Sequence, residues 1–106
     1  MHEENSPQNG RQALLRQLEM AEKLDALPFD DPKYESWRSE TGRILDQVFG
    51  KVEAKEHPCT RAFLSYGIPK EFMATRPEMQ VYYRNILRYQ TDLLRMYLED
   101  MDDQSG

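Results

Sequence analysis

The segment at 30–50, DDPKYESWRSETGRILDQVFG, constrains the fold most, because it specifies one helix together with both of its ends. The Asp31 side chain can accept a backbone N–H of the first turn, and Pro32 gives up only a donor that has no partner at that position. Gly50 supplies the backbone freedom with which helices commonly end. The residues between them recur at three- and four-residue spacing, which predicts an amphipathic helix. The stripe consists of Tyr34, Trp37, Thr41, Ile44, Leu45, Val48 and Phe49.

Two further long helices are expected, one on each side of this segment. In the first, at about 10–26, the core-facing row is Leu14, Leu18, Ala21 and Leu24, whereas Gln17 is expected to point outward. The last helix begins after Thr75 and has the capping-box pattern of a hydroxyl followed three residues later by a glutamate. Its apolar stripe is wide because several members are adjacent in sequence, namely Met79, Tyr82, Tyr83, Ile86, Leu87, Leu93, Leu94, Tyr97 and Met101.

The chain between these helices is less regular. Residues 51–58 predict a charged loop, 59–66 a short helix, and 70–75 remain ambiguous. No segment shows the alternation typical of a strand. We therefore expect an all-α fold, a small helical bundle of three long helices plus one short helix. The expected organisation is a disordered N-terminal tail at 1–9, a single helical domain at 10–101 and a disordered acidic tail at 102–106.

Charge and composition exclude several classes of function. The net charge is −5, and a basic middle segment lies between acidic ends, which disfavours binding to nucleic acid. The apolar runs are too short for a membrane span or a secretory signal, so no membrane partner is expected. Cys59 is the single cysteine, which excludes an intramolecular disulfide and favours the cytoplasm.

The sequence lacks the motifs of catalysis and of cofactor or metal binding. His57 and Cys59 are the only neighbouring soft ligands, and two side chains do not close a zinc site. Asp30 and Asp31 do not have the spacing of a calcium loop, and Asp46 is expected on the outer face of its helix as ordinary surface charge. We therefore expect no enzyme, no cofactor and no metal.

The outer face of the last helix is the candidate partner-binding site, because tyrosine and arginine are enriched at protein interfaces. Its candidate residues are Tyr83, Arg84, Arg88, Tyr89 and Arg95. The expected partner is another protein or a second copy of the chain. Two alternatives remain open: a small anionic ligand such as a nucleotide bound by Arg76, Arg84 and Arg88, or a solvated face whose arginines pair with Asp92 and other acids.

Residues 14–63 resemble the small helical region that precedes the TIR-like nucleotide-binding domain in some prokaryotic proteins, many of them linked to defence against phage. The resemblance rests on the leucine-rich LLRQLEMAEKL, the turn acids DDP, and the pattern W-R-S-E-T-x-R-I-L-x-x-V-F-G from Trp37 to Gly50. It covers about half of the chain, and a tyrosine-rich helix stands where the nucleotide-binding domain would follow. The resemblance implies a noncatalytic accessory, assembly or partner-contacting module in a defence or signalling system.

Overall fold

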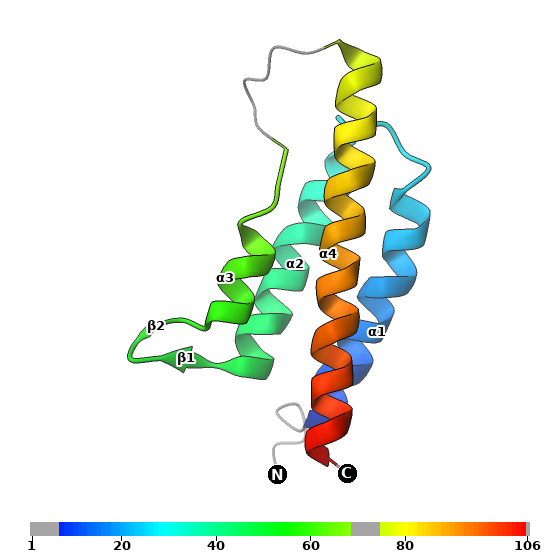
Figure 1. Ribbon diagram of the computed structural model, residues 1–106. Coiled ribbons are helices and arrows are strands. Elements are labelled where there is room, and N and C mark those ends of the chain that lie inside the picture. Colours follow the sequence, from blue (N-terminus) through cyan, green and yellow to red (C-terminus); the bar gives the residue numbers. More distant parts are fainter. Residues whose placement is uncertain (1–6, 69–74, 106) are drawn as a thin grey trace.

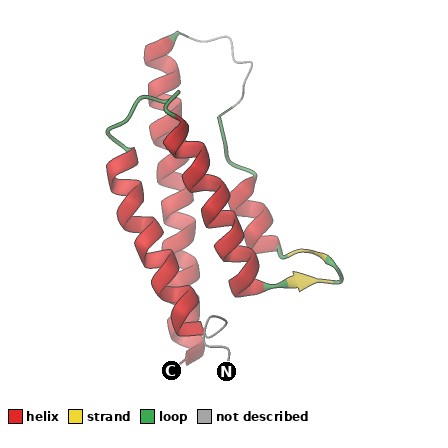
Figure 2. Cartoon of the chain, turned by 180° about the vertical axis from the view of Figure 1, so that it is seen from behind, coloured by secondary structure: helices red, strands yellow, loops and turns green. Residues whose placement is uncertain are grey.

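The computed structural model describes residues 7–68 and 75–105, and it confirms a small all-α bundle (Figure 1). Three long helices run along one another, and a short helix lies beside the second of them. A two-stranded hairpin projects from the end of α2 before the short helix begins (Figure 2). The elements are α1 at Pro7–Leu24, α2 at Pro32–Phe49, β1 at Lys51–Val52, β2 at Lys55–Glu56, α3 at Pro58–Leu64 and α4 at Arg76–Ser105.

Both ends of α2 are built as the sequence predicts. The backbone N–H of Lys33 donates to the Asp31 carboxylate at 2.9 Å, so the cap replaces a missing intrahelical partner. Gly50 has a φ of 73°, a conformation that residues with a Cβ rarely adopt, and its N–H donates to the Asp46 carbonyl. Helix α2 is therefore fixed at both ends by local chemistry.

Aromatic side chains join the four helices into one core. Trp37 and Tyr34 from α2 are buried, as predicted, and Phe49 at the end of the helix is half-buried. Trp37 packs against Phe63 of α3 with ring centroids 5.6 Å apart, and Tyr34 meets Tyr83 of α4 edge to face at 5.4 Å. Such ring pairs add to the free energy gained from burial alone. Helix α2 thus lies at the centre of the bundle, with α1 and α3 on its flanks, and its aromatic side chains pack against α4.

Two buried glutamines hold the helices in register. Gln17 is only 5% exposed, so the expectation that it points outward is wrong. Its side-chain amide donates to Thr41 Oγ1 at 2.7 Å, and its backbone carbonyl accepts from Trp37 Nε1 at 2.8 Å. Gln90 on α4 is fully buried and accepts from the Tyr34 hydroxyl at 2.7 Å. Its amide nitrogen donates to the carbonyls of Phe63 and Tyr66. Buried amides are tolerated because their polar atoms find these partners.

The short helix α3 is held by its neighbour α2. A Cβ built on Gly42 would lie 2.8 Å from Leu64, so the absence of a side chain there lets the two helices approach closely. At the other end of the contact, the Arg38 guanidinium donates to the carbonyls of Leu64 and Tyr66, where α3 ends. A cation at a helix C-terminus also complements the helix dipole.

Several limits differ from those expected. The charged loop at 51–58 contains an antiparallel pairing of Lys51 with Glu56 and of Val52 with Lys55. The short helix runs from 58 to 64 rather than from 59 to 66. Helix α1 begins at Pro7, within the expected disordered tail at 1–9, because proline is compatible with a first helical turn; residues 1–6 lie outside the described part.

Helix α4 begins as predicted and ends later than predicted. The Thr75 hydroxyl accepts from the Glu78 N–H at 3.3 Å, and the Glu78 carboxylate accepts from the Thr75 N–H at 2.9 Å, which completes the capping box. The helix continues through 102–105, which were expected to belong to a disordered tail. Arg11 of α1 donates to Asp102 at 2.7 Å and so gives the last turns a contact with the bundle. The ambiguous residues 70–74 lie outside the described residues.

Among the helices at 7–68 and 75–105, none is both long and apolar enough to cross a lipid bilayer.

Candidate functional site

The outward face of α4 carries large apolar side chains that the bundle leaves uncovered. Val81, Tyr89 and Met96 are 60%, 55% and 56% exposed. They recur at spacings of eight and seven residues, which places them on one side of an α-helix with successive members about two turns apart. The Tyr89 ring stacks on Tyr66, which follows α3, with centroids 5.8 Å apart. The apolar part of the face therefore lies on the flank of α4 that is closer to α3.

Of the two tyrosines proposed for this face, the structure retains one. Tyr83 is fully buried, and its hydroxyl donates to the Leu24 carbonyl at the end of α1. Burial raises the pKa of Tyr83 to about 12, because the charged phenolate would lose its solvation. Its inclusion in an outer partner-binding patch is therefore wrong. Successive residues of an α-helix are rotated by about 100° about its axis. This rotation turns Tyr83 into the core, although its neighbours in sequence lie toward the outward face of α4.

The arginines lie beside the apolar residues on the outward face of α4, and Arg84 is on the flank closer to α1. Arg84 Nε donates to the Asp25 carbonyl at the end of α1 at 3.3 Å, and Arg95 pairs with Asp92 at 3.1 Å. Arg88 is exposed, and within residues 7–68 and 75–105 it makes no ion pair or side-chain hydrogen bond. The expected pairing with Asp92 thus holds for Arg95. Among the described residues, Arg84 and Arg88 are thus the arginines of this face without a carboxylate partner, and Arg84 still donates to a backbone carbonyl.

The arginines of the anion-binding alternative are not brought together around a cavity. Arg76, at the start of α4, donates to Asp30 at 3.0 Å and lies over the Phe29 ring at 5.1 Å. The Arg76 guanidinium holds the pKa of Asp30 below its usual value. Arg76 is separated from Arg88 by more than three helical turns, so the two guanidinium groups do not converge on one small ligand.

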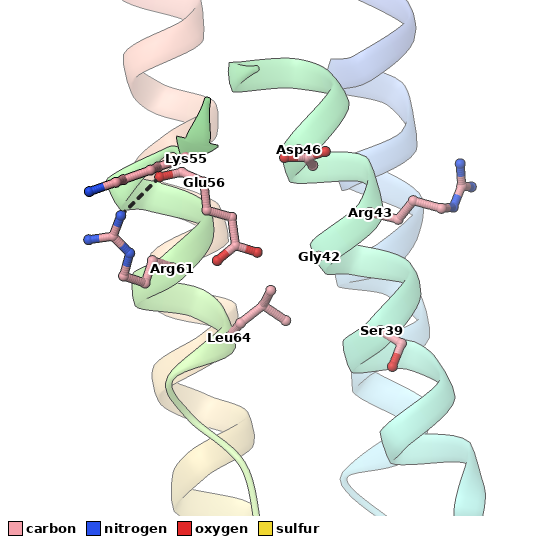
Figure 3. Close-up of a pocket in the computed structure, with 8 residues that line it drawn as sticks. All are labelled: Ser39, Gly42, Arg43, Asp46, Lys55, Glu56, Arg61 and Leu64. Carbon is pink, nitrogen blue, oxygen red and sulfur yellow. Dashed lines mark hydrogen bonds between the residues drawn. The ribbon is translucent and has the colours of Figure 1, made fainter. Parts of the chain in front are cut away.

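Sequence reasoning missed a groove between α2 and α3, which has a volume of about 720 Å³. The carboxylates of Asp46 and Glu56 face the space between the helices, whereas Arg43 points away from it (Figure 3). Asp46 Oδ1 is shut off from solvent and has no hydrogen-bond partner in the described part of the chain. The expectation that Asp46 is ordinary surface charge is therefore wrong for this oxygen. The groove is lined by Ser39, Gly42, Arg43, Asp46, Lys55, Glu56, Arg61 and Leu64.

Charged side chains of both signs line this groove. Arg43 is paired with Glu40, and Arg61 donates to the Glu56 carbonyl at 3.1 Å. The groove is open and holds no side chain poised as a nucleophile beside a base. No group of three or more potential metal ligands occurs among the described residues. We therefore assign no ligand to the groove.

The histidine and cysteine at the start of α3 take part in capping this helix. His57 Nδ1 accepts the N–H of Cys59 at 3.0 Å, so the imidazole acts as the helix cap, and its ring stacks on Phe49. Burial raises the pKa of the Cys59 thiol, which disfavours the nucleophilic thiolate. His57 and Cys59 thus belong to the start of α3.

No protein-family model, curated protein or solved structure shows a significant match to this chain. Val81 and Met96 are the members of the α4 face that the sequence did not reveal. The signal that could have found them is their distance of about two turns from Tyr89, because residues seven or eight apart share one helix face.

Proposed function

We propose that the chain is a noncatalytic protein-interaction or assembly module that binds its partner through the outward face of α4. The observation that carries the proposal is the row of Val81, Tyr89 and Met96, each more than half exposed on a helix whose other side forms the core. Large apolar and aromatic side chains with flanking arginines are the composition of protein interfaces. The bundle, in this proposal, supplies the rigid support that presents the helix.

The length of α4 supports the same proposal. With 30 residues it is about 45 Å long, whereas α1 and α2 have 18 residues each. The three exposed apolar side chains lie between Val81 and Met96 and are spread over more than four turns. A partner could therefore bury a continuous strip of one helix, which is the mode in which helices bind grooves or other helices.

Substitutions on the face test the proposal. We expect Tyr89→Ala and Met96→Ala each to weaken, and together to abolish, association of the chain with itself or with another protein. Because both side chains are exposed, circular dichroism and the melting temperature should change little. Met20→Ala is the matched control, because Met20 is 49% exposed on α1 and lies on a different surface. Association that survives the Tyr89/Met96 double substitution contradicts the proposal.

The anion-binding alternative has less support, because Arg76 and Arg84 are engaged by α1 and by the connection that follows it. The resemblance of residues 14–63 to the region before TIR-like domains adds a biological setting to the proposal. In that setting the module would serve a prokaryotic defence or signalling system. Loss of co-purification with a TIR-like protein on Tyr89→Ala is the outcome that this setting predicts.

A further inference from the structure

We infer that the partner of the α4 face is a second copy of the chain, with the two α4 helices packed antiparallel about a two-fold axis near Leu93. This inference rests on the proposed function and names its partner. An antiparallel two-fold contact is self-complementary, so each residue on one side of the axis must face its counterpart at an equal distance on the other side. The α4 face can therefore be tested for such symmetry residue by residue.

Two of the three exposed apolar residues, Tyr89 and Met96, satisfy this condition, whereas Val81 lies outside the paired segment. Tyr89 and Met96 are almost equally exposed, at 55% and 56%, and lie on the same side of the helix two turns apart. Their midpoint falls between Asp92 and Leu93. In the antiparallel pair, the Tyr89 ring of each copy meets the Met96 thioether of the other. Two equivalent sulfur–aromatic contacts form, and such contacts are favourable at ring edges.

The charged residues have nearly the same midpoint, which is an independent observation. Arg88 and Glu99 are both exposed, have opposite charges and lie on one flank of α4. In the described ranges neither is engaged in an ion pair or a side-chain hydrogen bond. Their midpoint falls between Leu93 and Leu94, one residue from that of the apolar pair. The antiparallel pair thus brings each Arg88 opposite a Glu99 of the second copy.

The charged residues nearest the two-fold axis are also compatible with an antiparallel pair. Asp92 and Arg95 form an ion pair within the helix at 3.1 Å, and their midpoint is again between Leu93 and Leu94. Two copies of this ion pair meet with opposite orientation, so each Asp92 approaches an Arg95 of the second copy. A parallel arrangement instead places Arg88 beside Arg88 and Glu99 beside Glu99, which is repulsive. Charge therefore selects the antiparallel direction.

Charge reversal gives the first test. We expect the wild-type chain to show a concentration-dependent dimer in sedimentation equilibrium, and Arg88→Glu or Glu99→Arg each to raise the dissociation constant about tenfold. Arg88→Glu/Glu99→Arg in one chain should restore the dimer, because both reversed pairs are again complementary. Mixing the two single variants should likewise restore it as a mixed dimer. Arg16→Glu on α1 is the matched control and should leave the mass unchanged.

Disulfide trapping tests the direction. In a Cys59→Ser background, Tyr89→Cys chains should cross-link with Met96→Cys chains and not with themselves. The two copies of position 89 lie about 10 Å apart along an antiparallel pair, too far for a disulfide. Efficient self-cross-linking of Tyr89→Cys would overturn the antiparallel arrangement, and so would a double charge reversal that fails to restore the dimer.

The outcomes separate this inference from the proposed function. A chain that stays monomeric up to roughly millimolar concentration overturns self-pairing. If that monomer still binds another protein in a manner sensitive to Tyr89→Ala, the proposed function stands and only its partner is different. If neither form of association occurs, both are wrong.

Discussion

Gln90 shows how much one buried amide can hold together. It is fully buried on α4, accepts from the Tyr34 hydroxyl of α2 and donates to the carbonyls of Phe63 and Tyr66 at the end of α3. One side chain therefore satisfies polar groups from two other elements. Each of those groups would be costly to bury alone, because it loses water without gaining a partner.

We expect Gln90→Leu to lower the free energy of unfolding by about 1–3 kcal/mol, because the volume is nearly kept while the Tyr34 hydroxyl loses its acceptor and the carbonyls of Phe63 and Tyr66 each lose one donor. Urea denaturation measures the change. Gln47→Leu is the control, because Gln47 is exposed on α2, and its effect should be within about 0.5 kcal/mol. Equal effects of the two substitutions would contradict the role of Gln90.

The two glutamines also mark the limit of what the sequence could predict at this scale. The periodicity of α1 predicts a surface position for Gln17. Nothing within α1 shows that Thr41 and Trp37 of α2 lie within hydrogen-bonding distance of it. Asp46 and Tyr83 were misplaced for the same reason. The caps at Asp31, His57 and Thr75 were predictable, since a cap and the amide it accepts lie within three residues of each other.

At the scale of the element, α3 depends on its neighbours. A helix of seven residues is too short to be stable alone in water. His57 caps its start, and Arg38 of α2 donates to the carbonyls of Leu64 and Tyr66 at its end, the second of which also accepts from Gln90. The existence of a short helix was predictable from its apolar residues and from Pro58. Its anchoring by Arg38 was not, because Arg38 also has the spacing of a surface ion pair with Glu35.

We expect Arg38→Met to release α3 locally. The apolar stem is kept, but the charged hydrogen bonds to the two carbonyls are lost, which costs about 1–3 kcal/mol. Hydrogen exchange should show faster exchange of the amides in α3, whereas α1 keeps its protection. Arg43→Met is the matched control on the same helix, because Arg43 pairs with Glu40 on the surface. Unchanged exchange in α3 would argue against this anchoring.

For the whole molecule, the fold class followed from the sequence, because the three long helices each carry a strong apolar period. The candidate site followed only in part. Arg88 and Tyr89 lie on the outward face as expected, but Met96 and Val81 had to be found from their exposure. A stripe as wide as that of α4 does not show which of its edges the bundle covers, since that depends on where α1 and α3 dock.

The buried tyrosines make the whole bundle sensitive to alkali. Burial raises the pKa of Tyr83 and of Tyr97 to about 12 each, and it also raises that of Tyr34. In the unfolded chain a tyrosine ionises near pH 10. Their contribution to stability is therefore complete below about pH 10 and is lost as the pH rises from there through 12.

We expect cooperative loss of helical circular dichroism over that range, coincident with the ultraviolet absorbance change of these tyrosinates. Tyr97→Phe should raise the pH midpoint of unfolding, because one group that ionises in the unfolded state is removed. Tyr89→Phe, at an exposed position, should leave the midpoint in place. Ionisation of Tyr34, Tyr83 and Tyr97 in a chain that stays fully helical would contradict this prediction.

The ion pair between Arg11 and Asp102 has a consequence for the connectivity of the chain. It joins the first turns of α1 to the last turns of α4, so positions 91 residues apart in sequence are neighbours in space. Ends this close can be joined by a short linker, and the chain can be opened elsewhere. The exposed hairpin tip at Glu53 and Ala54, where both residues have positive φ, is the natural opening, because a cut there relieves backbone strain. The order of the helices along the chain is thus separable from their arrangement in the bundle.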